Sequence, residues 1–466
     1  MRQQRMNFKL LALILTGLFA LLAVYGGYSV TVYGNRWVSH RGNTRIKGAE
    51  DVQKGDILDR NGVVLAATSK DERVYQSDAD SRKAVVHLLG DTGGNVKNGV
   101  ESFQASYLLG FETSLMERVA QALRGQTRKG DNVALTVDSR LSAAAYKAFQ
   151  SGAAGKKGAV VVMNYRTGEV LASVSLPAFD PNTKKQLSVD ELLNRSTQAL
   201  YPPGSTFKIV TLSGALQNLP DVMSRTLTCT GALQVQDKII TDFENAVHGN
   251  LTLREAFIKS CNNVFAGMAL ELGDERLRKT AESFGFNDNF LFRDLVVENS
   301  VYPTTGRNQV QIAWSGAGQG DVETTPLHMC MVAAAIANGG VMMEPALVKA
   351  IVSDGGAKRK EFAARVYRKA LPEDVAATVK DAMRAVVTSG TGTGAQVSGL
   401  KVLGKTGSAE STMDGQPVTH AWFVGFLDEP DLPYAISVLV EAGDSGGRVA
   451  APIAKQVFQY IKNNYR

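Results

Sequence analysis

The chain has 466 residues, of which 44% are hydrophobic and 21% charged; this is the composition of a globular protein and excludes a disordered or fibrous one. The net charge of +6 is small for this length and comes with no nucleic-acid-binding motif, so no nucleic-acid partner is predicted. Three cysteines and five scattered histidines form no spaced metal motif, so neither a disulfide framework nor a metal or cofactor site is predicted.

The first segment of note carries no charge over residues 10–34 and is long enough to span a bilayer as a helix. Three basic residues precede it: Arg2, Arg5 and Lys9. Positive charge on this side predicts that residues 1–9 form a cytoplasmic tail and that the remainder is exported. A cleaved signal peptide is the alternative, but the uncharged run is longer than usual for one, and no small-residue cleavage site ends it. We therefore predict an uncleaved transmembrane anchor.

Residues 35–150 are predicted to form a separate module of strands and helices next to the anchor. In the tract KGDILDRNGVVLA, at residues 54–66, an Asn-Gly pair between two apolar runs predicts a β-hairpin. Apolar residues three and four apart predict helix over residues 99–123, and a strand and then a helix starting near Asp138 are expected after it. The module contains no catalytic motif, which indicates a structural role.

A stretch of small residues, SGAAGKKG at residues 151–158, marks the predicted boundary, and residues 155–466 are assigned to a second domain. Two β-branched runs joined at Thr167-Gly168 predict a hairpin over residues 158–175. Two more strands are expected over residues 420–443, and an amphipathic helix over residues 451–465. Strands at both ends of a mostly helical region predict an α+β domain whose antiparallel sheet is built from distant segments.

The first candidate for chemistry is the tract YPPGSTFK at residues 201–208, in which Ser205 and Lys208 are three residues apart. On a helix this spacing places the lysine amine beside the hydroxyl, near the positive end of the helix dipole. A serine needs a nearby base to become a nucleophile, and a lysine serves only if burial or a neighbouring cation lowers its pKa. The alternative is an N-terminal capping serine followed by an exposed lysine.

The second candidate is SCN at residues 260–262, which interrupts an amphipathic helical stretch. A serine and an asparagine at such a break can point a hydroxyl and an amide into one cleft. The hydroxyl of Ser260 would then relay a proton, and the amide of Asn262 would bind a substrate carbonyl. The alternative is a loop cap, because serine and asparagine favour caps and turns.

The third candidate is KTGS at residues 405–408, at the end of an alternating strand pattern. Lys405 would supply positive charge, and the hydroxyls of Thr406 and Ser408 would bind a carboxylate. Gly407 would leave room for a substrate backbone against the strand edge. The N–H groups of Ser205 and Ser408 would form an oxyanion hole. The alternative is an edge strand protected by a lysine.

Together, in this order, Ser-x-x-Lys, Ser-x-Asn and Lys-Thr-Gly resemble the three motifs of the penicillin-binding proteins and serine β-lactamases. The tracts GAVVVMNYRTGEVLASVSLPAFDPN, NRSTQALYPPGSTFK and HAWFVGF are similar to the transpeptidase domain of that family. KGDILDRNGVVLA and GVESFQASYLLG resemble the membrane-proximal part of its class B members. Two positions depart from the usual pattern: Lys54-Gly55 replaces an Arg-Gly pair, and Ser408 replaces a threonine.

The resemblance implies a D,D-transpeptidase that cross-links peptidoglycan stem peptides. Ser205 would be acylated by the D-Ala-D-Ala end of a stem peptide, with Lys208 taking its proton and Ser260 relaying a proton to the leaving group. An amine on a neighbouring stem would then accept the acyl group. β-Lactams would mimic the donor and block Ser205. The residues implied to bind substrate are Asn262, Lys405, Thr406, Gly407 and Ser408.

The same resemblance implies the fold and the location of the protein. A single-pass anchor in a bacterial cell membrane would precede residues 35–150, which would form an elongated α+β membrane-proximal module of a pedestal or dimerisation-like kind. An extracytoplasmic transpeptidase domain like that of the serine β-lactamases would follow. That fold has an antiparallel sheet flanked by helices and a helical subdomain. Because residues 35–150 are too short for a glycosyltransferase domain, an integral-membrane peptidoglycan glycosyltransferase would be the partner.

Three alternatives stay open beside transpeptidation. A β-lactamase-like hydrolase shares the three motifs, although the tract ELLN at residues 191–194 precedes Ser205 and so lies in the wrong order for a class A enzyme. A D,D-carboxypeptidase differs only in using water as acceptor. A β-lactam-sensing receptor would need a cytoplasmic effector, for which about nine residues ahead of the anchor leave little room.

Overall fold

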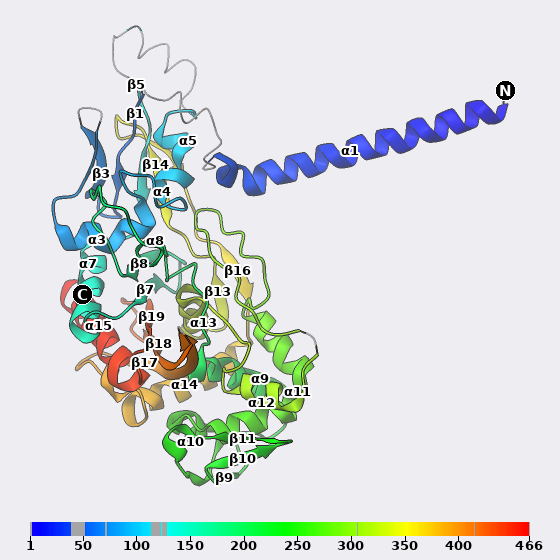
Figure 1. Cartoon of the computed structure of the whole chain (residues 1–466), viewed down its shortest axis with the longest axis vertical. Coiled ribbons are helices and arrows are strands. Elements are labelled where there is room, and N and C mark those ends of the chain that lie inside the picture. The colour runs from blue at the N-terminus through cyan, green and yellow to red at the C-terminus, as the bar shows by residue number, and fades with distance from the viewer. Residues whose placement is uncertain are drawn as a thin grey trace.

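A computed structural model gives the fold and describes residues 2–38, 52–69, 72–112, 123, 128–304, 306–413 and 415–465. Helices and strands are mixed throughout these ranges, and most of the strand pairing is antiparallel, which confirms the predicted α+β class. Figure 1 shows an elongated body with one sheet near the end from which the first helix projects and a second sheet farther along.

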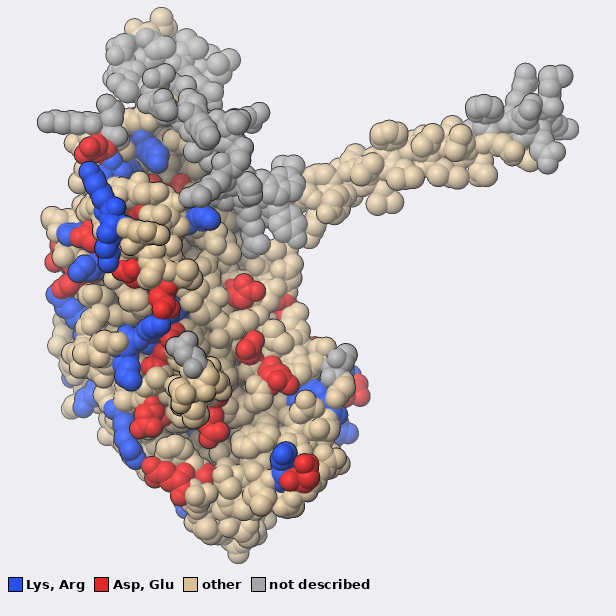
Figure 2. Space-filling model, in the orientation of Figure 1, with Lys and Arg blue, Asp and Glu red and all other residues tan. Residues whose placement is uncertain are grey.

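The first helix, α1 (Arg2–Val38), contains an apolar stretch from Lys9 to Ser29 that is long enough to cross a membrane. The helix stands apart from the body (Figure 1), and the described side chains that Figure 2 shows along it are uncharged. On the body, acidic and basic side chains are interspersed over the same face (Figure 2). The predicted segment 10–34 is therefore one continuous helix with the composition of a membrane anchor.

A six-stranded sheet lies near the anchor end of the body and has the order β15-β14-β6-β2-β3-β4. Its strands are β2 (Ile57–Leu58), β3 (Val64–Ser69), β4 (Glu72–Tyr75), β6 (Asn132–Leu135), β14 (Val348–Val352) and β15 (Lys358–Glu361). A separate parallel pair joins β1 (Val52–Gln53) to β5 (Arg128–Lys129). Because β14 and β15 come from the second half of the chain, this sheet combines strands from both sides of the predicted boundary near residue 150.

The hairpin predicted at residues 54–66 is confirmed, since β2 and β3 pair antiparallel around a turn in which Gly62 has a φ of +82°. The buried carboxylate of Asp59 shapes this turn by accepting hydrogen bonds from the backbone N–H groups of Asn61 and Val63, at 2.8 and 2.9 Å. Its other oxygen accepts a hydrogen bond from the Ser139 hydroxyl at 2.8 Å. The turn is thereby fixed to the start of the following helix, α7 (Ser139–Gly152).

Three further helices belong to the N-terminal part of the body: α3 (Ala79–Leu89), α4 (Val100–Phe103) and α5 (Ala105–Leu108). The helix predicted over residues 99–123 is represented by the two short helices α4 and α5, and residues 113–122 lie outside the described part of the chain. The helix predicted to start near Asp138 is α7, and the Asp138 carboxylate caps it by accepting from the N–H groups of Arg140 and Leu141.

The second sheet has five antiparallel strands in the order β17-β18-β19-β7-β8. Its strands are β7 (Gly158–Asn164), β8 (Val170–Leu176), β17 (Val402–Met413), β18 (Gln416–Leu427) and β19 (Tyr434–Val440). Two strands come from the start of the predicted domain and three from its end. The prediction of a sheet assembled from distant segments is therefore confirmed.

Helices cover both faces of this sheet. Val161 and Met163 of β7 belong to the hydrophobic cluster that contains α13 (Pro326–Ala337), whereas Val160 and Val162 pack in the cluster with α7 and α15 (Ala451–Tyr465). The strand is thus buried on both sides, which explains its continuous apolar sequence. The helix α14 (Glu373–Ser389) packs along β17, the strand that carries the third motif.

The remaining elements lie mostly between β8 and β17, and Figure 1 places α9 to α12 at the end of the body farthest from α1. The helices are α8 (Val189–Leu192), α9 (Lys208–Asn218), α10 (Leu253–Lys259), α11 (Asn262–Ser283) and α12 (Gln309–Gly316). The short strands are β9 (Leu227–Cys229), β10 (Ala232–Val235), β11 (Lys238–Thr241), β12 (Gly249–Leu251), β13 (Val341–Met343) and β16 (Val366–Lys369). The single-turn elements are η1 (Gly204–Phe207), η2 (Phe243–Asn245), η3 (Thr393–Ala395) and the π-helical η4 (Gly446–Ala450).

Candidate active site

The serine of the first motif lies on η1, the single turn that leads into α9. Gly204, just before it, has a φ of +53° and donates its N–H to the Gly318 carbonyl at 2.9 Å. A Cβ at Gly204 would lie 3.0 Å from the Ser408 carbonyl oxygen, so glycine is required both for the backbone angle and for the close approach of β17. Ser205 is half-buried at the wall of a cleft.

The lysine of the same motif is fully buried beneath that cleft. Its Nζ donates to the Ser260 carbonyl at 2.6 Å and to Asn262 Oδ1 at 2.7 Å, and it lies 3.3 Å from Ser260 Oγ. Burial lowers the pKa of Lys208 from 10.5 to about 7, and the nearby thiol of Cys261 and carboxylate of Asp242 oppose this only in part. The alternative of an exposed lysine is therefore wrong.

The predicted break at SCN is confirmed, because α10 ends at Lys259 and α11 begins at Asn262. Ser260, between them, adopts a φ of +60°, a left-handed conformation that is costly for a residue with a Cβ. Cys261 caps α11, its sulfur accepting from the Val264 N–H at 3.4 Å. The strained turn directs Ser260 towards Lys208, and α11 starts with the amide of Asn262 beside the same lysine.

A second buried lysine approaches the Ser260 hydroxyl from the other side. Lys405 on β17 donates from Nζ to Ser260 Oγ at 2.8 Å and to its neighbour's carbonyl, Thr406 O, at 3.0 Å. Burial lowers the pKa of Lys405 well below its ordinary value, and the positive charge of Lys208 lowers it further. The first, second and third motifs therefore meet at Ser260, which links both lysines.

The rest of the third motif lines the cleft from β17. Thr406 Oγ1 lies 2.5 Å from Thr391 Oγ1, and Ser408 Oγ accepts from the Gly446 N–H at 3.4 Å. A Cβ at Gly407 would meet the Pro203 carbonyl at 3.1 Å and Thr206 Cγ2 at 3.0 Å. The sequence suggests that Gly407 makes room for substrate, but on the Cβ side the space is filled by the segment around Ser205. Gly407 lets β17 pack against the candidate nucleophile.

The cleft that these motifs share has a volume of about 930 Å³. Its wall combines Ser205, Ser260, Asn262, Thr406, Gly407 and Ser408. Within the described ranges, no hydrogen bond joins the Ser205 hydroxyl to Lys208 Nζ, so the predicted contact between nucleophile and base is not formed in this structure. Free-enzyme geometry of this kind does not exclude a base that moves into reach when substrate binds.

Other residues of the cleft are not anticipated from the sequence. Thr391 and Thr393 come from a loop that follows α14, and Arg448 of η4 faces Glu244 of η2 across 3.3 Å. In the sequence, the alternating glycines and threonines of residues 390–394 predict a glycine-rich loop. The glycines carry no side chain, so they leave space around the two threonines. No sequence signal identifies the Glu244–Arg448 pair.

Four potential metal ligands lie together behind the second motif: Cys229, Asp242, His248 and Cys261. Their ligand atoms are all within 4.8 Å of one another. In the structure Asp242 Oδ2 accepts from the thiols of Cys229 and Cys261 at 2.9 and 3.3 Å, while Oδ1 accepts from the N–H of Asn262. Thiolate, imidazole and carboxylate are ligands that Zn²⁺ takes.

The sequence predicts no metal because these four residues are spread over residues 229–261 without a spaced motif. The short strands β9 to β12 fold them together. The Asp242 carboxylate holds the first residue of α11, so this cluster supports the second motif from behind. Cys261 is thus part of this polar cluster as well as the cap of α11.

Comparison with known proteins adds independent information. The family model of the penicillin-binding protein transpeptidase domain matches residues 158–459. The chain is 34% identical over 435 residues to the peptidoglycan D,D-transpeptidase PbpA of Mycolicibacterium smegmatis, which covers 86% of this chain and 88% of that protein.

Solved structures give the same picture. The ceftriaxone acyl-enzyme complex of penicillin-binding protein A from M. tuberculosis matches with a TM-score of 0.80 and 29% identity, over 88% of this chain and 99% of that one. The D,D-transpeptidase domain of a peptidoglycan glycosyltransferase from Eggerthella lenta matches with a TM-score of 0.74 and 30% identity, over 89% and 99%.

Proposed function

The chain belongs to the penicillin-binding protein transpeptidase family, and from this premise we propose that it cross-links peptidoglycan through an acyl-enzyme on Ser205. It is a class B penicillin-binding protein with D,D-transpeptidase function, and several of its relatives are named for this activity. The observation that carries the residue assignment is the meeting of Lys208 and Lys405 at Ser260, within the cleft that Ser205 lines.

In the acylation step, Ser205 Oγ bonds to the carbonyl carbon of the penultimate D-Ala, and the C–N bond to the terminal D-Ala breaks. Lys208 takes the serine proton, because a buried amine with a pKa of about 7 is substantially neutral at physiological pH. Ser260 relays this proton, receiving one from Lys208 as it gives its own to the departing amine, with Lys405 orienting its hydroxyl. The products are an ester on Ser205 and free D-alanine.

In the second step an amine of a neighbouring stem peptide attacks the ester carbonyl. The new C–N bond is the cross-link, the C–O bond to Ser205 breaks, and the proton that the amine loses passes to Ser205 Oγ. A β-lactam follows the first step but keeps its leaving group attached by the opened ring, so Ser205 stays blocked. The relative from M. tuberculosis forms such acyl-enzymes with ceftriaxone and imipenem. We therefore assign both stem peptides and β-lactams to the Ser205 cleft of this chain.

Substrate positioning falls to the remaining motif residues. Thr406 and Ser408 present hydroxyls from one side of β17 to the donor's terminal carboxylate, with the amine of Lys405 behind them. Asn262 lines the cleft next to Lys208 and is assigned to hold the peptide while keeping that lysine in place. Gly407 serves by bringing this strand against the Ser205 segment.

The arrangement in the membrane is also a proposal. The basic residues before the apolar stretch of α1 support an N-terminal tail in the cytoplasm and a catalytic domain outside it. Residues 35–150 would then act as the membrane-proximal module and residues 155–466 as the transpeptidase domain. Because the mechanism uses no glycan polymerisation, an integral-membrane glycosyltransferase would supply the strands.

Cross-linking of peptidoglycan strands tests this function. The full chain, solubilised in detergent, is incubated with strands that carry pentapeptide stems, and the digested products are separated by mass spectrometry. We expect cross-linked dimers and released D-alanine, both abolished by penicillin pretreatment and by Ser205→Ala. Released D-alanine without dimers would favour a D,D-carboxypeptidase, and rapid hydrolysis of the penicillin itself would favour a β-lactamase-like hydrolase. Absence of all these products would contradict the proposal.

Replacing Ser260 separates its hydroxyl from its backbone conformation. Both Ser260→Ala and Ser260→Gly should slow acylation by penicillin about 100-fold, because both remove the hydroxyl that relays the proton. Only glycine accepts the φ of +60° without cost, so the alanine variant should be the less stable by about 1 kcal/mol. Acylation rates and denaturant unfolding measure the two effects. A glycine variant that acylates at the wild-type rate would show that the hydroxyl has no role.

A further inference from the structure

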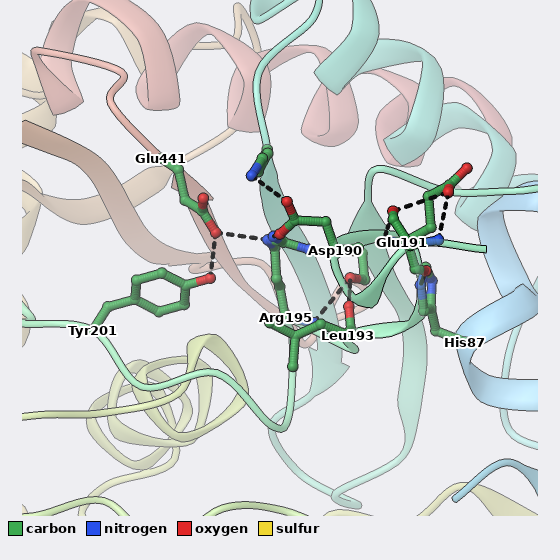
Figure 3. A network of polar contacts seen from close by, with 10 residues as sticks. His87, Asp190, Glu191, Leu193, Arg195, Tyr201 and Glu441 are labelled. Atoms are coloured by element: carbon green, nitrogen blue, oxygen red, sulfur yellow. Dashed lines mark hydrogen bonds and ion pairs between the residues drawn. The ribbon is translucent and has the colours of Figure 1, made fainter. Parts of the chain in front are cut away.

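Arg195 lies ten residues before Ser205 and belongs to none of the three motifs, yet its side chain is only 2% exposed. A buried guanidinium is retained only where its donors find acceptors. Arg195 Nε donates to Glu441 Oε1 at 2.6 Å, Nη1 donates to the Asp190 carbonyl at 2.7 Å, and Nη2 donates to the carboxylate of Asp190 at 2.5 Å. Figure 3 shows Arg195 between these two acidic residues.

Glu441 joins this arginine to the nucleophile segment. The Oε1 atom that accepts from Arg195 also accepts from the Tyr201 hydroxyl at 2.6 Å (Figure 3). Glu441 is 7% exposed, so both bonds form in a site that excludes water and are stronger for it. The carboxylate is therefore the common partner of a buried cation and a buried phenol.

Tyr201 in turn fixes the three residues that lead from it to Ser205. Its backbone exchanges two hydrogen bonds with Thr324, at 2.9 and 3.0 Å. The next two residues are prolines, which hold φ near −65° and leave little freedom before Gly204. The Trp422 indole N–H donates to the Pro202 carbonyl at 3.0 Å. A displacement at Tyr201 would therefore be carried along a stiff segment to Ser205.

Glu441 is also connected through the sheet to the strand that carries the third motif. It follows Val440, the last residue of β19, which pairs with Ala421 of β18. Ala421 in turn pairs with Ser408 of β17. One row across three strands thus connects Glu441 to the substrate-binding strand, while its side chain connects to the nucleophile segment.

We propose that Arg195 and Glu441 are positioning residues for the acylation step. By holding Tyr201 against the end of β19, the pair sets the distance between Ser205 and the strand of Thr406 and Ser408. This inference rests on the proposed function of Ser205 but adds residues that the three motifs do not contain. Asp190, whose side chain is 49% exposed, also pairs with Lys157 at 2.6 Å and contributes less to the geometry.

A neighbouring contact extends the cluster to the membrane-proximal part. Asp190 lies on α8, and the carbonyl of the next residue, Glu191, is 2.7 Å from His87 Nε2 on α3 (Figure 3). Through Asp190, Arg195 therefore also connects α8, which contacts α3, to the segment that carries Ser205. This position explains why a fully buried charge stands at residue 195 in place of an apolar residue.

The test measures acylation by a fluorescent penicillin over a range of concentrations, which separates the noncovalent dissociation constant from the first-order acylation rate constant. Glu441→Gln keeps the shape and removes the charge, and we expect the rate constant to fall about 10- to 100-fold with little change in the dissociation constant. Tyr201→Phe removes one hydroxyl and should lower the rate constant about 3- to 10-fold. Asp190→Asn should change it less than about threefold.

Two further measurements distinguish positioning from general stability. Tyr201→Phe combined with Glu441→Gln should lose less than the product of the two single losses, because both variants act on the same contact. Val457→Ala, in the core of α15 and away from the cleft, is the matched destabilised control and should keep the wild-type rate constant below its unfolding temperature. If Glu441→Gln does not fold, Tyr201→Phe alone decides.

Wild-type rate constants in both Tyr201→Phe and Glu441→Gln would overturn the proposal. So would losses that merely follow the unfolded fraction, as in the Val457→Ala control. Ser205→Ala is included in the same assay. If that variant still became labelled, the proposed function would fail at its own step, and the result would be distinguishable from a failure of Arg195 and Glu441.

Discussion

Replacing Ser205 with alanine should abolish covalent labelling by a fluorescent penicillin. The stable bond requires an oxygen nucleophile at the cleft wall, and the alanine side chain offers none. The buried lysines, the Ser260 turn and the substrate-binding strand all stay in place, so noncovalent binding of the penicillin should persist. Denaturing gel electrophoresis followed by fluorescence imaging measures the label, and mass spectrometry of the intact wild-type protein measures the mass of the adduct.

A matched control comes from the same helical segment. Ser213 lies on α9, and its hydroxyl donates to the Ile209 carbonyl at 2.7 Å, a bond within the helix. Ser213→Ala removes the same group from a fully buried site and should leave labelling intact. Equal labelling of Ser205→Ala and the wild type would contradict the nucleophile assignment. Loss of label in both alanine variants would point to a folding defect.

The features that the sequence predicts correctly are local. The Asn61-Gly62 turn and the hairpin around Thr167-Gly168 depend on residues a few positions apart, and the structure contains both. The break between α10 and α11 is visible for the same reason, because Ser260 is the C-cap of α10 and Asn262 is the first residue of α11. The order of the three motifs also predicts the family, and the match to the family model confirms this prediction.

What the sequence leaves out depends on contacts between distant residues. The environment that lowers the pKa of Lys208 is created by α9, α10 and α11 together, and no spacing pattern reports burial of this kind. The contact of Lys405 with Ser260 joins residues 145 positions apart. The short strands β9 to β12 likewise bring together the cluster of Cys229, Asp242, His248 and Cys261. Side-chain contacts of this type depend on tertiary packing and leave no local pattern in the sequence.

The boundary near residue 150 illustrates the same limit. The composition change at residues 151–158 is real in the sequence, and β7 begins there. However, β14 and β15 return to pair beside β6, and α7 packs with α15. A local change in composition marks where a strand begins, but not which later segment completes the earlier sheet.

Replacing Lys208 with methionine is expected to have the second-largest effect. The methionine fills a similar volume but accepts no proton, so the acylation rate constant should fall about 1,000-fold or more while Ser205 remains in place. Lys259→Met is the matched control, because Lys259 also borders the cleft but is exposed to solvent. The control should stay within about threefold of the wild type. Similar losses in the two variants would indicate that the cleft needs positive charge, not a base.

The pH dependence gives an independent check on the same lysine. Because burial places the pKa of Lys208 at about 7, the neutral amine dominates above this pH and the ammonium below it. The wild-type acylation rate constant should therefore rise with pH through about 7, reach a plateau, and fall about tenfold per unit below about pH 6. The residual rate of Lys208→Met should lack this step. A wild-type profile that stays flat from about pH 5 to about pH 9 would contradict the base assignment.

The same shift has a consequence for stability, which makes the assignment testable without any substrate. The pKa of Lys208 is about 7 when folded and 10.5 when unfolded, so the unfolded chain binds the additional proton between these values. The wild type should thus lose stability as pH falls from 10.5 towards 7, with no further loss from this lysine below about 7. Lys208→Met lacks the group and should lack this slope. Denaturant unfolding of both proteins at several pH values measures this difference in slope, because the two proteins share all their other titrating groups. Identical slopes of unfolding free energy against pH would show that the buried lysine is not the low-pKa amine that acylation requires.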